Sequence, residues 1–178
     1  KGVSATGNLR LYSKALFLTI SFLALYIHLV FYTPPAGWAI FECLLLSFFT
    51  SAIGFNIMHD GAHGSFSSKT WVNALAASSL NFLGANTFMW KMKQNVIHHA
   101  YTNIDGVDDD LDAKPFLRLC ESQKFYKMHK YQHFYFWFVY SMLYLFWIFF
   151  SDYKKYFSRK LGDIPLKKMT CQVEIAFW

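Results

Sequence analysis

Long apolar runs separated by short polar segments dominate the chain. One almost unbroken apolar run covers residues 15–32, and a second covers residues 38–58. At about 1.5 Å of rise per residue, a helix formed by either run is long enough to cross the hydrocarbon core of a membrane. The segment 33–37 contains two consecutive prolines and a glycine, which interrupt helical structure. The pattern therefore predicts a helical hairpin whose two outer ends lie on one side of a membrane.

Basic residues flank the outer ends of this predicted hairpin. Arg10 and Lys14 precede the first run, and Lys69, Lys91 and Lys93 follow the second. Lys and Arg concentrate in the short cytosolic segments of membrane proteins. We therefore expect the outer ends of the hairpin, and the polar residues next to them, to face the cytosol.

Two later apolar segments are less regular. Residues 71–90 are rich in small and polar side chains, so we expect an interfacial helix there; a third crossing would separate the polar segments on either side of it. Residues 134–150 are just long enough to span, but basic residues flank both ends, which leaves both a span and a re-entrant helix open. The fold class predicted for residues 1–178 is an all-α polytopic membrane protein.

Composition agrees with a membrane protein. Of the 178 residues, 54% are hydrophobic, 21% are aromatic and only 16% are charged, which is rare in a soluble domain. The net charge of +6 suits basic flanks facing anionic lipid and shows no pattern typical of nucleic-acid binding. Cys43, Cys120 and Cys171 are scattered, so neither a disulfide framework nor a zinc knuckle is predicted. The chain begins at Lys1 without a methionine, and we expect it to be part of a longer protein.

Two histidine clusters follow the apolar runs. His59 and His63 are four residues apart, as are Gln94 and His98, and His99 follows directly. On an α-helix, residues four apart lie on one face, so their side chains can bind one metal ion, and His99 could reach a second. Neutral imidazole suits iron, zinc and copper. Two such clusters at membrane boundaries predict a metal held against a lipid chain.

These clusters carry a resemblance to a known family. Residues 59–67, His-Asp-Gly-Ala-His-Gly-Ser-Phe-Ser, resemble the first histidine box of membrane-bound fatty acyl desaturases. Residues 96–104, Val-Ile-His-His-Ala-Tyr-Thr-Asn-Ile, with the acidic run after them, resemble the second box. The likeness is greatest to the front-end, delta-6-like acyl-lipid desaturases. That family carries a third histidine box, which we expect in a C-terminal part beyond this chain, so residues 1–178 are expected to be a partial desaturase domain.

The resemblance implies an oxidoreductase with a non-haem di-iron centre, in which two iron ions and O2 remove hydrogens from a methylene group of an acyl chain. It assigns His59, His63, His98 and His99 as iron ligands. The family usually has His where this chain has Gln94, and a carboxamide is a weaker ligand, so we expect reduced iron occupancy. The implied partners are an acyl lipid or acyl thioester substrate and a ferredoxin or cytochrome b5-type electron donor.

The acidic run offers residues that could orient the imidazoles. Asp108, Asp110 and Asp112 could accept the second N–H of a ligating histidine, and Asn103 could cap or orient the same region. The alternative is a solvated acidic loop.

Four further polar residues near the membrane are expected to have structural roles. His129 and His133 are expected to anchor the aromatic segment at the interface. His28 is expected to form a hydrogen-bonded contact between helices, and Glu42 a similar contact or one with lipid headgroups.

Three other functions remain compatible with the sequence. A lipid-chain hydroxylase of the same superfamily would share the ligands and would yield an alcohol. A zinc-dependent membrane hydrolase would need one closed three-ligand site with an activated water. An inactive scaffold homologue would retain the fold without the reaction, and Gln94 is the feature that favours it.

Overall fold

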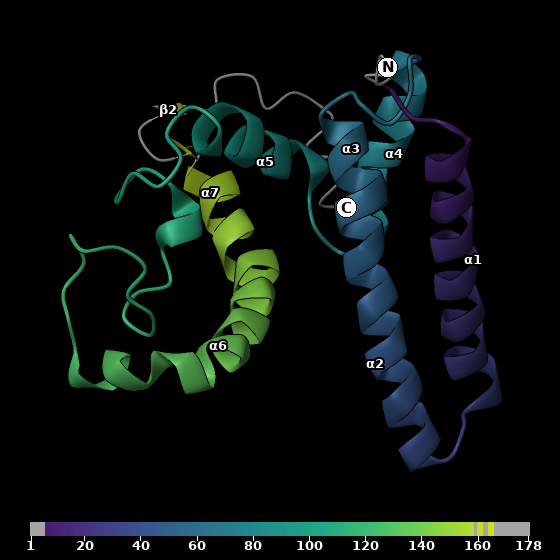
Figure 1. The fold of residues 1–178 in the computed structure, drawn as a ribbon, viewed down its shortest axis with the longest axis horizontal. Helices are drawn as coiled ribbons and strands as arrows, with labels where there is room; N and C mark the ends of the chain where they lie inside the picture. Colours follow the sequence, from purple (N-terminus) through teal and green to yellow (C-terminus); the bar gives the residue numbers. More distant parts are fainter. Residues whose placement is uncertain (1–5, 159, 162–163, 166–178) are drawn as a thin grey trace. The chain divides into compact units, whose positions relative to one another are not determined.

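The computed structural model describes residues 6–158, 160–161 and 164–165 (Figure 1). Arg159, one of the basic residues after 134–150, and Cys171 lie outside the described residues. Helices form nearly all of the regular structure, which confirms the predicted all-α class. The strands within the described part are β1 (Lys160–Leu161) and β2 (Ile164–Pro165), a short antiparallel pair.

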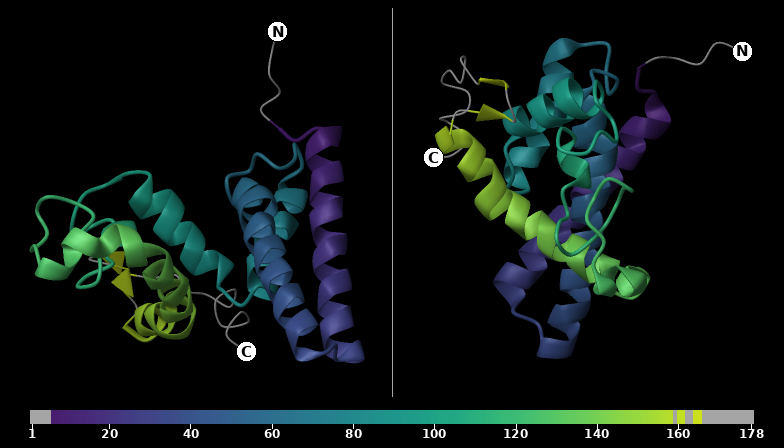
Figure 2. Two further views of the ribbon diagram at one scale, coloured as in Figure 1. Left: turned by 60° about the horizontal axis from the view of Figure 1, so that its bottom comes forward. Right: turned by 90° about the vertical axis from the view of Figure 1, so that its left-hand side faces the viewer.

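The chain divides into two compact units, Lys1–Thr87 and Phe88–Trp178. The first unit is built on a hairpin of α1 (Leu9–Tyr32) and α2 (Ala36–Ile53), which lie side by side in Figure 1 and in the left view of Figure 2. The side chain of Asn8 caps α1 by accepting a hydrogen bond of 3.1 Å from the backbone N–H of Leu11.

The second helix of the hairpin continues beyond α2 without a break. It runs through a π-helical segment, η1 (Gly54–Met58), into the short α3 (His59–Ala62). The predicted first histidine cluster therefore begins at the last turn of this long helix.

The core of the first unit lies between the two helices of the hairpin and α4. It contains the buried side chains of Ala15, Leu18, Ile53, Ile57, Phe66 and Ala76. Most other apolar side chains of the hairpin point outward, as expected for helices that contact lipid. At the end of the hairpin where α1 leads into α2, His28 Nδ1 lies 2.8 Å from Glu42 Oε2, which confirms the expected helix contact. Glu42 is buried in this contact.

The segment predicted as one helix over 71–90 forms two helices. α4 (Thr70–Phe82) packs against α3 and η1, and α5 (Thr87–Lys91) follows after a turn. Gly84 causes the break, because its φ of 92° is a left-handed conformation that favours glycine. Thr87 then restarts the helix, with its backbone N–H donating to Asn81 Oδ1 at 2.9 Å.

The second unit consists of short helical segments, a long loop and one long helix. The short segments are η2 (Met92–His98) and η3 (Asp109–Leu111). The long helix comprises η4 (Lys127–Tyr131), α6 (Gln132–Phe146), η5 (Trp147–Ser151) and α7 (Asp152–Ser158), and it curves along its length (Figure 1).

Three helices in the described part of the chain are long and apolar enough to cross a membrane. They cover Leu9–Tyr32, Ala36–Ala62 and Lys127–Ser158. Their outward-facing apolar side chains and their length support association with a membrane.

Candidate functional site

The first histidine cluster lies at the end of α3. The rings of His59 and His63 are 4.5 Å apart between centroids and inclined by 62°. Metal–imidazole bonds are about 2 Å long, so two rings at this separation can reach one ion. The helix ends here because Gly64 takes a left-handed conformation, with φ 74°. Asp60 O then accepts hydrogen bonds from the N–H groups of Ser65 (2.9 Å) and Phe66 (3.2 Å), which turns the chain back.

The second cluster lies on the π-helix η2. His99 N–H donates to Gln94 O at 3.1 Å, a bond that spans five residues where an α-helix would span four. A π-helix rotates less per residue than an α-helix, so the side chains of neighbouring residues point in more similar directions. The ring centroids of His98 and His99 lie 5.7 Å apart. Gln94 is half-buried on the same segment, one turn earlier. The imidazoles of His98 and His99 and the carboxamide of Gln94 therefore come from the π-helix η2 and its C-cap residue.

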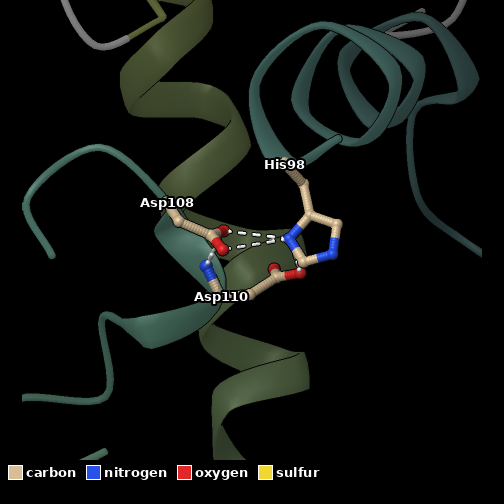
Figure 3. Close-up of side chains that lie close together, drawn as sticks. All are labelled: His98, Asp108 and Asp110. Atoms are coloured by element: carbon tan, nitrogen blue, oxygen red, sulfur yellow. Dashed lines mark hydrogen bonds and ion pairs between the residues drawn. The ribbon is translucent and has the colours of Figure 1, made fainter. Parts of the chain in front are cut away.

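A buried carboxylate holds the ring of His98 (Figure 3). Both carboxylate oxygens of Asp108 lie 3.1 Å from His98 Nδ1. Asp108 is only 2% exposed and also accepts hydrogen bonds from the N–H groups of Asn103 (2.9 Å) and Asp110 (3.1 Å). Burial raises the pKa of this carboxyl, but the hydrogen bonds from Asn103, His98 and Asp110 outweigh it and lower the pKa below the ordinary value.

Asp108 therefore fixes the tautomer of His98. An ionised carboxylate accepts only, so Nδ1 carries the proton that it donates to Asp108, and Nε2 presents its lone pair. This arrangement, with a carboxylate behind the ring, is typical of histidines that bind metals.

Asp110 lies beside the same ring and is shared with a lysine. Its Oδ2 is 3.2 Å from His98 Nδ1, and its Oδ1 is 2.5 Å from Lys93 Nζ. His98, Asp108 and Asp110 offer ligand atoms within 4.8 Å of one another, so they could also hold an ion directly. The ammonium of Lys93 and the three hydrogen bonds to Asp108 already satisfy these carboxylates, which favours the orienting role.

The other sequence-predicted residues of this region lie in different surroundings. Asn103 contributes through its backbone N–H, and its φ of 62° places it in the left-handed region. Asp112 is exposed and lies 3.7 Å from Lys114 Nζ. Of the predicted carboxylates, Asp108 and Asp110 are thus brought to His98, whereas Asp112 pairs with Lys114.

Two lysines that the sequence analysis did not connect with the cluster hold the acidic run in place. Lys93 pairs with Asp110 and lies over the ring of Trp147, at 5.6 Å from its centroid. Lys155 of α7 pairs with Asp109. Both pairs join residues far apart in the sequence, so no local pattern indicates them.

The structure corrects the role expected for His129. Its side chain is buried; Nε2 donates to Pro115 O at 2.9 Å, and Nδ1 accepts from Tyr126 N–H at 3.2 Å. Both ring nitrogens therefore tie together parts of the loop before α6, and His129 is a structural residue instead of an interfacial anchor. His133 remains exposed, with its ring 4.0 Å from that of Phe134.

The donor set of the two clusters suits iron. Each cluster presents paired imidazoles, and at least one of them is oriented by an ionised carboxylate. Imidazole is a ligand common to iron, zinc and copper sites, and a carboxylate behind it raises its basicity.

Comparison with known proteins identifies the family of this chain. The family model for fatty acid desaturase matches residues 33–176, which include both histidine clusters. The family implies a reaction that depends on iron and uses O2. No solved structure matches the chain.

Several curated relatives are acyl-lipid desaturases by name. The sn-1 linoleoyl-lipid 6-desaturase of Arthrospira platensis is 32% identical over 142 residues, which cover 79% of this chain and 39% of the relative. The acyl-lipid (8-3)-desaturase of Physcomitrium patens is 33% identical over 159 residues, covering 88% and 33%. A 6-desaturase of Synechocystis is 26% identical, covering 85% and 42%.

The chain thus spans about two fifths or less of the length of these relatives. Their names agree with the resemblance to acyl-lipid desaturases read from the two boxes, and they do not favour the hydroxylase, zinc hydrolase or scaffold alternatives. On the family model and on this likeness over most of its length, the chain belongs to the fatty acid desaturase family.

Proposed function

We propose that the protein to which this chain belongs is an O2-dependent, di-iron desaturase that introduces a double bond into a fatty acyl chain of a lipid. It would then act as an oxidoreductase in lipid metabolism and fatty acid biosynthesis. The observation that carries this proposal is the pairing of His98 Nδ1 with the buried Asp108, within a box that matches the family. The relatives named as acyl-lipid desaturases support an acyl chain esterified in a lipid as the substrate.

We propose His59, His63, His98 and His99 as iron ligands. Bound iron would supply the reduction of O2 and the removal of hydrogen from an unactivated methylene group. The task of this chain is then to present neutral imidazoles in fixed directions, and Asp108 does so for His98. Gln94 occupies a position where the family usually has histidine, and we propose that it binds iron weakly and lowers occupancy.

We propose that Asp110 and Asn103 support this arrangement indirectly. Asp110 links the ring of His98 to the ammonium of Lys93, and Asn103 gives Asp108 a backbone hydrogen bond. Asp112 was predicted with them, but its contact with Lys114 supports a role in holding the loop.

Expression of the complete reading frame tests the function. A host with a known fatty-acid profile should gain a new unsaturated fatty acid, whose double bond is mapped by mass spectrometry. A His98→Ala variant expressed to the same level should give no new product. A new hydroxylated fatty acid without a double bond would replace the desaturase proposal with a hydroxylase. Zinc in place of iron in the purified protein would contradict both.

We propose that the hairpin spans the membrane over about 15–32 and 38–58, with 71–90 at the interface and the histidine clusters on the cytosolic side. The apolar surface of the helices and the basic flanks support this topology. An introduced cysteine at Ser65 should then react with an impermeant reagent from the cytosol, and one at Thr33 should not.

The long helix that contains 134–150 allows two topologies. Lys127–Ser158 is long enough to span, and basic residues near both ends also suit a re-entrant path. Cysteines introduced at Lys130 and Lys154 would become accessible from the same side for a re-entrant helix and from opposite sides for a span.

We propose a ferredoxin or cytochrome b5-type protein as the electron donor. The support is chemical, because the proposed reaction consumes electrons that a donor must supply. Exposed Lys124, Lys127 and Lys130 suit an acidic carrier. Electron transfer to the full-length protein should slow as salt is raised, and a rate independent of salt would contradict this docking.

A further inference from the structure

Asn73 of α4 holds the turn that follows the first histidine cluster. Its Oδ1 accepts a hydrogen bond of 2.7 Å from the N–H of Ser67, and its Nδ2 donates to Ser67 O at 2.7 Å and to Gly64 O at 3.1 Å. The side chain is buried, with about 9% of its surface exposed. The side chain of Asn73 therefore forms hydrogen bonds with three backbone groups of the turn. These groups lie outside any helix or strand that could pair them.

The other side of the cluster is held by close packing on the same helix. A Cβ atom added to Gly61 would lie 2.6 Å from Ala77 N, 2.7 Å from Ala76 Cβ and 2.8 Å from Asn73 O. Real Cβ atoms do not approach so closely, so only glycine allows α3 to pack against α4 in this way. Gly61 stands between the two histidines of the cluster in the sequence.

His63 thus lies between two points that are both fixed to α4. Gly61 packs against the α4 backbone before it, and Gly64 is bound to Asn73 after it. The intervening residues are the end of α3, which His63 N–H closes by donating to His59 O at 3.0 Å. A short helical end held on both sides has little freedom to reorient its side chains, as a metal site requires.

We propose that Asn73 is a positioning residue for the first histidine cluster. By fixing the turn 64–67 against α4, it fixes the directions in which His59 and His63 present their imidazoles to iron. This inference rests on the proposed iron-dependent function. Asn73 itself bonds only to backbone groups, so it acts through the turn and not by touching the metal.

The test compares Asn73→Ala with Asn81→Ala in the purified full-length protein. Asn81 lies on the same helix and also accepts from a backbone N–H, but its partner is Thr87, after α4, and not the histidine turn. Iron content is measured over a range of iron concentrations, together with the visible absorption spectrum of the cobalt-substituted protein and the midpoint of thermal unfolding.

The Asn73→Ala variant should bind iron about tenfold more weakly, the size of effect expected for a group that orients a ligand, and its cobalt spectrum should change. Asn81→Ala should lower the unfolding midpoint while leaving iron affinity and spectrum unchanged. Asn73→Asp keeps the size and the Oδ1 acceptor, but it replaces the NH2 donor with an oxygen that faces the carbonyl oxygens of Gly64 and Ser67. It should therefore also weaken iron binding. Wild-type iron affinity and spectrum in both Asn73 variants would overturn the proposal.

A measurement on the unmodified protein covers the case in which the variants do not fold. Iron loading should slow hydrogen exchange of the Ser67 N–H, which Asn73 holds, and leave that of the Thr87 N–H unchanged. Equal effects at the two sites, or no effect at Ser67, would overturn the positioning role. Failure of the unmodified protein to take up iron would instead refute the proposed function, so the two failures are distinguishable.

Discussion

His98 Nδ1 lies 3.1 Å from each carboxylate oxygen of Asp108, and the carboxylate is almost fully buried. Asp108 follows His98 by ten positions in the sequence, so the loop between them must fold back onto the end of η2. The backbone N–H groups of Asn103 and Asp110 complete the hydrogen bonding of Asp108. A single side chain therefore both closes the loop and sets the tautomer of a proposed iron ligand.

Replacement of Asp108 by asparagine should disrupt both roles. A neutral carboxamide accepts hydrogen bonds more weakly than a carboxylate does. Its NH2 group would also face N–H donors that bond to the carboxylate of Asp108. We expect iron affinity in the full-length protein to fall about 10- to 100-fold. We also expect faster hydrogen exchange over residues 98–112. Iron content at graded iron concentrations and exchange mass spectrometry measure the two effects.

Asp112→Asn is the matched control for this change. Asp112 belongs to the same acidic run, but it is exposed and lies near Lys114. Its replacement should leave iron affinity within about twofold of the original, because exposed ion pairs contribute little. Equal loss of iron in both variants would show that the charge of the run, and not the contact with His98, is what matters.

The sequence predicted the hairpin and both histidine clusters because those features depend on local properties. Run length, the prolines of 33–37 and the spacing of histidines are visible without a structure. The π-helical segments are not visible in this way, because i→i+5 bonding leaves no fixed residue pattern. The link between Lys93 and Asp110 was missed for another reason, because it depends on how the loop after η2 folds back.

The roles of the acidic residues depend on the path of the loop. Asp108 and Asp112 have the same chemistry, and only the loop determines that Asp108 is buried against His98. The contact between Asn73 and Ser67 is similar, since nothing in the sequence distinguishes Asn73 from Asn81. The sequence pattern thus indicated the proposed ligands but not most of the residues that hold them.

Gln94→His should raise iron occupancy. An imidazole binds iron more strongly than a carboxamide, and Gln94 lies on η2 with His98, directly before His99 at its C-cap. We expect the full-length variant to contain more iron per polypeptide and to produce more unsaturated fatty acid in the same host. Asn95→His places the same ring one residue further and should change neither quantity. A Gln94→His protein that gains neither iron nor product would contradict the weak-ligand proposal.

Asp105 should make the long loop of the second unit sensitive to acid. Its carboxylate accepts hydrogen bonds from Gln123 (3.0 Å), Ser122 (2.8 Å) and Lys114 (3.3 Å). The hydrogen bond from Gln123 first, and then those from Ser122 and Lys114, lower the pKa of Asp105 despite some desolvation. Because the pKa is lower in the folded state, the stabilisation is complete above the ordinary carboxyl pKa and is lost as pH falls through the lowered value.

Hydrogen exchange over residues 105–123 measures this effect. At neutral pH, Asp105→Asn should exchange faster than the unmodified protein at the same pH, because the charged acceptor is gone. Once the pH lies below the lowered pKa of Asp105, its carboxyl is neutral in the folded state too, and the two proteins should exchange alike. Glu121→Gln, an exposed carboxylate in the same loop, should match the unmodified protein throughout. A difference between Asp105→Asn and the unmodified protein that persists in acid would contradict the assignment.

The contact of His28 with Glu42 should couple the two helices of the hairpin. The atoms His28 Nδ1 and Glu42 Oε2 are 2.8 Å apart, Glu42 is buried, and His28 also stacks on Tyr32. Hydrogen bonds between membrane helices contribute about 0.6 kcal/mol on average and up to about 1.7 kcal/mol. The single variants His28→Ala and Glu42→Ala and the double variant form a cycle, in which we expect a coupling energy of about 1 kcal/mol, measured by unfolding in detergent. Each single change should cost nearly as much as the double change, because either one breaks the same contact. Strictly additive losses would show that the two side chains stabilise the hairpin independently, despite their proximity.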